Sequence, residues 1–282
     1  MTEYYAFLYL LSRHKKYYLH QDRIFLHLKA NKARIFFELI AFVKDLDPLL
    51  LEQLLSNELF QTLKMSSGEN HFCAYGEELY PLEFYLLTDP PLVFSYRGKP
   101  CWLHSLKLTV VGSRNPTLKS LQWMSLELPK LLARNSWVTV SGGAIGVDLY
   151  FHQLSLKSQC PTIVILPSGI NKVYPLAIKS KEEEIVKQGG CFLSEFMPHE
   201  EVKKYHFQHR NRLIAALNQF CLVIEAKEKS GSLITGHFVL ELGKDLMVLP
   251  GHPMDLNFHG SHHLLKLGGI VFTSHIDLDT LF

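Results

Sequence analysis

The chain has 282 residues, enough for one large core and a smaller module, so two domains are expected. Its 47% hydrophobic and 20% charged residues are ordinary for a globular protein and argue against extensive disorder. The formal net charge of +2 is too small to indicate a polyanionic partner, so any basic surface must arise from local clustering.

Cysteines, histidines and apolar runs argue against several kinds of site. The five cysteines are odd in number, widely spaced and without a C-x-x-C pair, which indicates a reducing compartment and a cytoplasmic protein. None of the 15 histidines has neighbours that complete a zinc site, so we expect no metal and no cofactor. The apolar run Tyr4–Leu11 is too short to span a membrane and leads into a basic segment, so we expect no signal peptide and no membrane partner.

The first 67 residues differ in composition from the rest of the chain. They contain no glycine and a single proline, Pro48, and apolar residues such as Ile35, Leu39 and Val43 recur at helical spacing. The polar, turn-prone stretch Ser66–Asn70 follows. We therefore predict a small all-helical domain over residues 1–70.

From Leu92 onward, short β-branched or aromatic runs alternate with glycine turns and amphipathic helices. Strands that alternate with helices favour an α/β fold with a doubly wound, mostly parallel sheet and helices on both faces, because parallel neighbours need crossover connections. We predict this second domain over residues 71–282. Its expected strands are 107–111, 136–140, 162–166, 190–195, 220–225, 245–249 and 270–272.

Two glycine turns lead from expected strands into helices. The first runs from Gly112 to Thr117, with Thr117 as the expected helix cap, and the second from Ser141 to Asp148. Such a turn directs backbone N–H groups and the positive end of a helix dipole to one point, which suits a phosphate. Neither turn is a G-x-G-x-x-G or P-loop motif, so neither carries the usual dinucleotide or nucleoside triphosphate fingerprint. Close packing of helix on sheet is the alternative reason for either loop.

Three further turn segments follow expected strands: 166–175, 230–236 and Pro250–Gly251. In a parallel sheet the C-terminal ends of the strands share one edge, where ligands bind. We therefore expect the five turns to converge on one ligand site.

The stretch Lys203–Arg212 carries four permanent positive charges, no acid and two aromatic residues. Aromatic faces stack on unpaired bases while Lys and Arg neutralise phosphates, so this mixture favours single-stranded nucleic acid. Alternatively, Arg210 and Arg212 pair with carboxylates such as Glu195 or Glu225.

These segments, in this order, resemble the DNA-processing protein A (DprA/Smf) family over roughly residues 75–272. The resemblance is carried by Tyr80-Pro81, Asp89-Pro90-Pro91, Val111-Gly112-Ser113-Arg114, Ser141-Gly142-Gly143-Ala144, Gly146-Val147-Asp148, Tyr174-Pro175, Ser194-Glu195, Arg210-Asn211-Arg212-Leu213-Ile214-Ala215, Glu225-Ala226, Ser230-Gly231-Ser232-Leu233-Ile234-Thr235 and Leu249-Pro250-Gly251. It implies a Rossmann-like core that binds single-stranded DNA, forms homodimers and has no enzymatic activity. It also implies a protein that protects incoming DNA and loads the RecA recombinase in natural transformation and homologous recombination.

The resemblance also implies which residues meet DNA, with the Gly-Ser-Arg loop and the basic, aromatic stretch holding the backbone and a base. The candidate DNA-binding residues are Gly112, Ser113, Arg114, Ser141, Gly142, Asn171, Lys204, Phe207, Arg210, Arg212, Ser230, Gly231 and Ser232. The N-terminal helices resemble the small, SAM-like domain of the family. The chain departs from the family pattern at Pro167, Asn171, Gly236 and Gly260–Leu265, and we expect no C-terminal winged helix.

Two other functions remain open. A related Rossmann-like family binds nucleoside monophosphates and cleaves their glycosidic bond, which requires a carboxylate that stabilises positive charge on the ribose. Asp148 and Glu195 are the candidates near the loops, although the P-G-G-x-G-T motif and paired glutamates of those hydrolases are absent. The third function is an interaction scaffold with a vestigial pocket. Single-stranded DNA binding requires the turns to form one cationic cleft in which Arg114 and Lys204 stay accessible.

Overall fold

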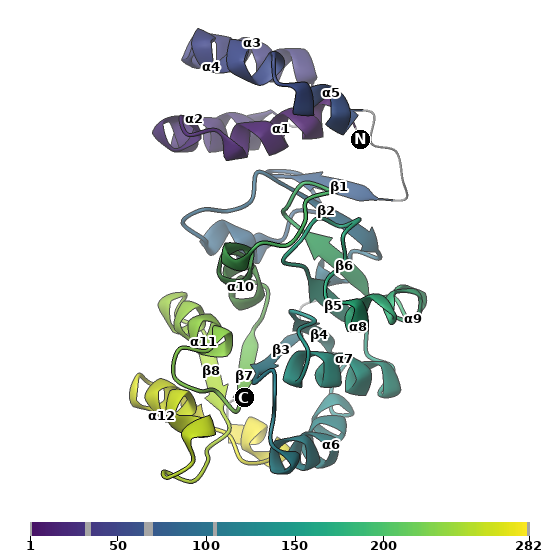
Figure 1. The fold of residues 1–282 in the computed structure, drawn as a ribbon, viewed down its shortest axis with the longest axis vertical. Helices are drawn as coiled ribbons and strands as arrows, with labels where there is room; N and C mark the ends of the chain where they lie inside the picture. Colours follow the sequence, from purple (N-terminus) through teal and green to yellow (C-terminus); the bar gives the residue numbers. More distant parts are fainter. Residues whose placement is uncertain (1, 32–34, 65–69, 104–105, 281–282) are drawn as a thin grey trace.

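The computed structural model describes residues 2–31, 35–64, 70–103 and 106–280, and within them one nine-stranded sheet forms the centre of the molecule (Figure 1). The strand order is β1-β2-β6-β5-β4-β3-β7-β8-β9. The strands are β1 (His71–Ala74), β2 (Val93–Gly98), β3 (Lys107–Gly112), β4 (Val138–Ser141), β5 (Thr162–Ile165), β6 (Cys191–Ser194), β7 (Phe220–Ile224), β8 (Asp245–Val248) and β9 (Ile270–Val271).

Strands β3 to β9 are parallel, and β3 lies between β4 and β7, with Val111 opposite Val223. All seven strands expected from the sequence are present. The sequence did not predict β1 and β2, which extend the sheet in antiparallel fashion beyond β6, with Ser95 opposite Ser194. The fold is thus the expected Rossmann-like α/β fold, and its C-terminal strand ends share one edge.

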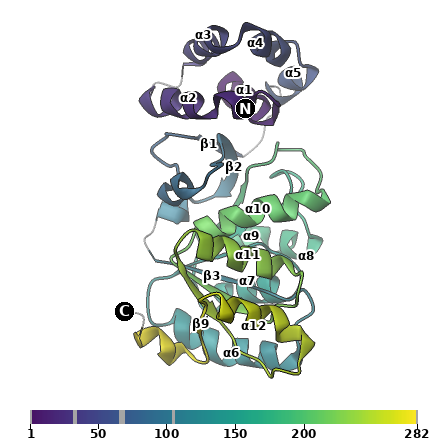
Figure 2. The same cartoon turned by 90° about the vertical axis from the view of Figure 1, so that its left-hand side faces the viewer.

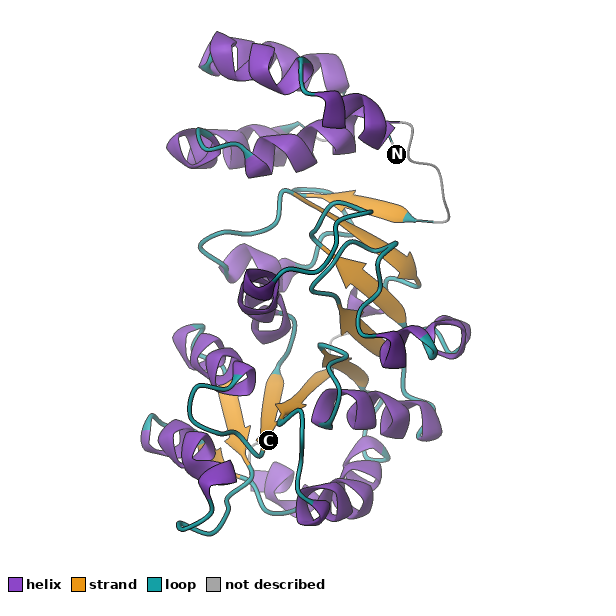
Figure 3. Ribbon diagram, in the orientation of Figure 1, coloured by secondary structure: helices purple, strands orange, loops and turns teal. Residues whose placement is uncertain are grey.

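Successive side chains of the buried strands point to opposite faces of the sheet and pack in two different cores. Helices therefore cover both faces of the sheet (Figure 3). On β3, Val111 packs in the same core as Leu213 and Val239, whereas Val110 packs with Met124 and Phe151 on the other face. The helices of this part are α6 (Leu118–Leu132), α7 (Val147–Lys157), α8 (Leu176–Lys179), α9 (Glu182–Lys187), α10 (Lys204–Ala216), α11 (Gly231–Glu241) and α12 (His259–Lys266). As predicted, Thr117 caps α6: its side chain accepts a hydrogen bond from the backbone N–H of Ser120.

In the described part of residues 2–64, five helices precede the sheet and lie beyond β1 and β2 (Figures 1 and 2). They are α1 (Glu3–Arg13), α2 (Tyr17–Ala30), α3 (Phe36–Leu46), α4 (Pro48–Leu55) and α5 (Glu58–Lys64). Helix α1 packs on the sheet, where the Tyr5 and Phe72 rings stack with centroids 5.5 Å apart. Residues 66–69 of the expected domain boundary lie outside the described residues, and an independently folding unit over residues 1–70 stays a prediction.

None of the helices in the described ranges combines the length and the apolar character needed to cross a membrane. The five cysteines are buried and unpaired as disulfides.

Candidate nucleic-acid interface

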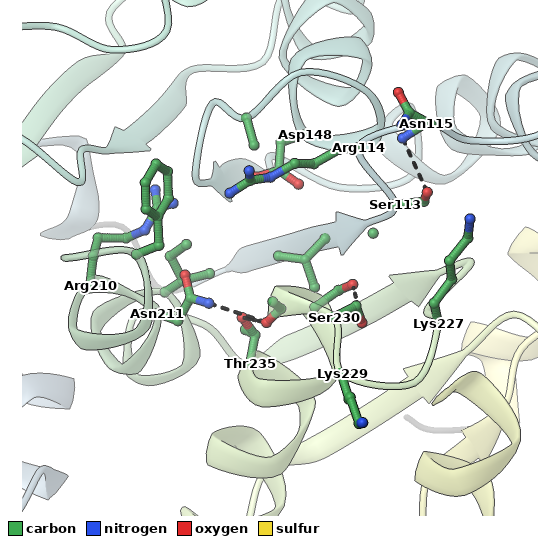
Figure 4. Close-up of a pocket in the computed structure, with 17 residues that line it drawn as sticks. Ser113, Arg114, Asn115, Asp148, Arg210, Asn211, Lys227, Lys229, Ser230 and Thr235 are labelled. Atoms are coloured by element: carbon green, nitrogen blue, oxygen red, sulfur yellow. Dashed lines mark hydrogen bonds between the residues drawn. The ribbon is translucent and has the colours of Figure 1, made fainter. Parts of the chain in front are cut away.

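An open cavity of about 350 Å³, here called the main cavity, lies at the shared C-terminal edge of the sheet (Figure 4). Its walls come from the turn after β3, the start of α7, one face of α10 and the loop between β7 and α11. Segments more than 100 residues apart in the chain therefore meet there. Eight of the candidate residues line it: Gly112, Ser113, Arg114, Phe207, Arg210, Ser230, Gly231 and Ser232.

Arg114 is an exposed cation of this cavity and points into it (Figure 4). Its guanidinium carbon lies 4.9 Å from the centroid of the Phe207 ring, a cation–π contact that orients both side chains. Within the described part of the chain Arg114 has no ion pair, so its N–H donors are available to a bound anion. The Arg114 and Phe207 pair thus combines a phosphate partner with an aromatic face.

Arg210 lines the same cavity but is buried in its wall. Its Nη1 donates hydrogen bonds to the carbonyl oxygens of Gly142, at 2.7 Å, and Ile165. Burial lowers the pKa of Arg210 to about 10, and nearby Asp148 opposes this shift. Burial likewise raises the pKa of Asp148, and Arg210 opposes that shift. Arg210 therefore joins the turn after β4 to α10 from behind the cavity surface.

Some glycines of these turns are required by close packing. A Cβ on Gly112 would lie 2.0 Å from the carbonyl oxygen of Ile224, and one on Gly142 would lie 2.5 Å from Nη1 of Arg210. Gly146 has φ +92, and a Cβ there would lie 2.4 Å from the carbonyl oxygen of Ser113. The packing explanation therefore accounts for these glycines, even though the turns they form line the cavity.

The cap of α11, Ser230, and the first residues of the helix line the main cavity. Ser230 caps the helix by accepting a hydrogen bond from the N–H of Leu233 at 3.2 Å. Asn211 fixes this turn to α10, because its Nδ2 donates to the carbonyl oxygen of Gly231 at 3.2 Å. The positive end of the helix dipole and Arg114 thus act on the same space, which suits an anion.

Two basic residues of the cavity were missed by the sequence analysis. Lys227 and Lys229 are exposed, lie in the loop between β7 and α11, and line the main cavity. Lys227 extends toward Ser113, whereas Lys229 points away from that turn (Figure 4). The signal was present in the sequence, since both lysines lie within three residues of the Ser230–Ser232 turn.

Five candidate residues lie outside the lining of the main cavity: Arg212, which is described below, and the four that follow. Ser141 is buried, and its hydroxyl donates to the carbonyl oxygen of Val110 at 2.7 Å. Gly142 lines only a side pocket of about 40 Å³. Asn171 accepts hydrogen bonds from Asn70 and Arg97, both at 2.9 Å. Lys204 is exposed at the start of α10.

The family model described as DNA recombination-mediator protein A matches residues 71–280. The chain belongs to this DprA family. It is 34% identical to Protein Smf of Escherichia coli over 209 residues, which are 74% of this chain and 56% of the E. coli protein. It thus spans little more than half the length of that relative.

Two solved DprA structures are also similar. The protein from Streptococcus pneumoniae superimposes with a TM-score of 0.81 at 28% identity, covering 100% of this chain and 98% of the other. A DprA from Helicobacter pylori, described for its single-stranded DNA binding mode, matches with a TM-score of 0.66 at 30% identity over 76% of this chain and 95% of the other. The DprA fold therefore extends through the N-terminal helices of this chain.

In this DprA family member, Arg212 lies on the other side of α10 from the main cavity. Its Nη2 donates to Glu195 at 2.8 Å and its Nε to Asp89 at 2.9 Å, and only 6% of the residue is exposed. Arg210 and Arg212 therefore lie in the walls of two different cavities. The suggested pairing with Glu195 is present, whereas Glu225 accepts hydrogen bonds from residues at the start of α6 instead.

The carboxylates considered for glycosidic-bond hydrolysis are also separated. Asp148 lines the main cavity, whereas Glu195 lines a different cavity on the other side of α10. The described residues contain no group of three or more His, Cys, Asp or Glu side chains that could hold a metal ion.

Acid should weaken the fold through Glu195. Burial raises its pKa, but Arg212 and His209 outweigh burial and lower the pKa to about 2. Since the unfolded-state pKa is about 4.3, ionised Glu195 stabilises the fold fully above that pH, and its contribution is lost as the pH falls toward 2. We expect Glu195→Gln to flatten the loss of unfolding free energy between about pH 5 and pH 2, measured by urea unfolding. An unchanged pH profile would contradict this role, and exposed Glu52→Gln serves as the control.

Proposed function

We propose that this DprA family member binds single-stranded DNA in the main cavity. The observation that supports this most directly is the convergence of four chain segments on one open cavity, where Arg114 has no ion pair among the described residues and lies beside the Phe207 ring. Arg114, Lys227 and the N–H groups that begin α11 would meet phosphates. The Phe207 ring would stack on an unpaired base, whose face a duplex would hide.

The wider role follows from the family. We propose that the chain acts without catalysis, as a homodimer in the cytoplasm, to protect an incoming strand and load RecA during natural transformation and homologous recombination. The description of the family as recombination mediators supports this role, as does the single-stranded DNA binding mode for which the H. pylori protein is described.

The binding proposal is tested by fluorescence anisotropy with a labelled oligo-dT and a duplex of the same length. We expect tight binding of the single strand, weaker binding of the duplex, and a linear fall of log affinity with log salt concentration as phosphate contacts release counterions. Equal affinity for both DNAs, or binding of neither, would overturn the proposal.

A further inference from the structure

Helix α10 presents two different faces to two cavities. Phe207, Arg210 and Asn211 line the main cavity, whereas Tyr205, His209 and Arg212, at spacings of four and three residues, line a second cavity of about 370 Å³. The turn between α1 and α2 supplies much of the opposite wall of this second cavity. Figure 2 shows α10 between α11 on one side and the N-terminal helices with β1 and β2 on the other.

The carboxylates around the second cavity already have partners. Arg212 holds Asp89 and Glu195, and Arg13 holds Glu200 at 2.9 Å. Two groups in the wall lack such partners among the described residues: exposed Lys15, which makes no ion pair there, and the buried Nη1 of Arg212, which has no acceptor. The cavity therefore offers the exposed Lys15 cation, while its carboxylates are already paired, which favours an anionic occupant over a cationic one.

Exposed aromatic rings line the same cavity as Lys15. Tyr18 is 65% exposed and Tyr205 is 57% exposed, although both line the cavity. Tyrosine faces next to a free lysine form the combination that stacks unpaired bases and neutralises phosphates.

The start of α10 provides a cationic path between the two cavities. Lys203 and Lys204 are both exposed there. Lys203 Nζ lies 6.0 Å from the centroid of the Tyr205 ring and 3.5 Å from Oε1 of Glu200. A helix is about 10–12 Å thick including its side chains, so a strand of a few nucleotides can pass from one face of α10 to the other.

We propose that the second cavity is a further contact for the strand that occupies the main cavity. The strand passes Lys203 and Lys204, stacks bases on Tyr205 and Tyr18, and places a phosphate at Lys15. The N-terminal helices thereby become part of the DNA-binding surface. This inference rests on the proposed single-stranded DNA binding in the main cavity.

Oligonucleotides of two different lengths distinguish binding at the main cavity from binding at the second cavity. A short oligomer of about six nucleotides fills the main cavity alone, whereas one of about 20 nucleotides reaches both. We expect Lys15→Glu with Tyr18→Ala to lower the affinity for the long oligomer by about tenfold or more and to leave the affinity for the short one unchanged. We also expect Lys15→Ala alone to reduce the salt dependence of long-oligomer binding by about one unit of slope.

The control variant combines Arg23→Glu with Phe37→Ala, which reverses one exposed charge and removes one exposed aromatic ring elsewhere on the N-terminal helices. It should bind both oligomers like the unaltered chain. If the Lys15 and Tyr18 variant keeps full affinity for the long oligomer, or loses affinity for both lengths equally, the second contact is overturned. Failure of the unaltered chain to bind either oligomer would instead overturn the proposed function.

Discussion

Replacing Arg114 with alanine should lower the affinity for single-stranded DNA by about 10- to 100-fold, equivalent to roughly 1.4–2.7 kcal/mol. Arg114 is an exposed cation that points into the main cavity and contacts the Phe207 ring in the cavity wall. The substitution therefore removes a phosphate partner. It also removes the contact that orients the Phe207 ring, whose face would stack on a base. Anisotropy titrations with oligo-dT at several salt concentrations measure the loss, and the salt slope should fall by about one.

Two further variants make this experiment specific. Arg114→Lys keeps the charge but loses the planar guanidinium, so its affinity should lie between those of the unaltered chain and the alanine variant. Lys157→Ala removes an exposed cation at the far end of α7, away from the main cavity, and should leave binding unchanged. Full affinity in Arg114→Ala would show that DNA does not occupy this cavity.

Replacing Arg212 with alanine should lower the free energy of unfolding by about 3–5 kcal/mol, a large fraction of the stability of an ordinary domain. Arg212 is the cation that compensates Glu195, and both side chains are buried. Without Arg212 an ionised carboxylate would stay in the interior with only His209 beside it. Urea unfolding at neutral pH measures the effect.

Two further variants serve as comparisons. One breaks a partly exposed ion pair, and the other removes both buried charges. Arg13→Ala breaks the ion pair with Glu200. Because the Arg13 side chain is 32% exposed, this variant should lower the free energy of unfolding by less than about 1 kcal/mol. Combining Arg212→Met with Glu195→Leu removes both charges and should recover part of the lost stability. A loss below 1 kcal/mol in Arg212→Ala would contradict the role of the buried pair.

The fold could be predicted because its signals are local. Alternating strand and helix patterns located the seven parallel strands, and parallel strand ends necessarily bring their turns to one edge. Strands β1 and β2 were not predicted, because no crossover helix of the kind that marks the parallel units joins them.

The candidate site was only partly predictable because the sequence shows Lys203–Arg212 as one continuous basic stretch. In a helix, successive residues are rotated by about 100°, so the stretch is divided between two faces and two cavities. The position of Arg212 also depends on Asp89, 123 residues away, a pairing that no local pattern reveals.

The two lateral strands of the sheet limit how copies of this chain can associate. Strand β9 contributes two residues and β1 four, and each forms one end of the strand order. Such short outer strands expose few unpaired backbone groups as a template for intermolecular β-pairing. Extension of the sheet from one copy into the next is therefore disfavoured, and a dimer would form by packing side-chain surfaces against each other. The same short outer strands protect the folded chain against fibrillar aggregation.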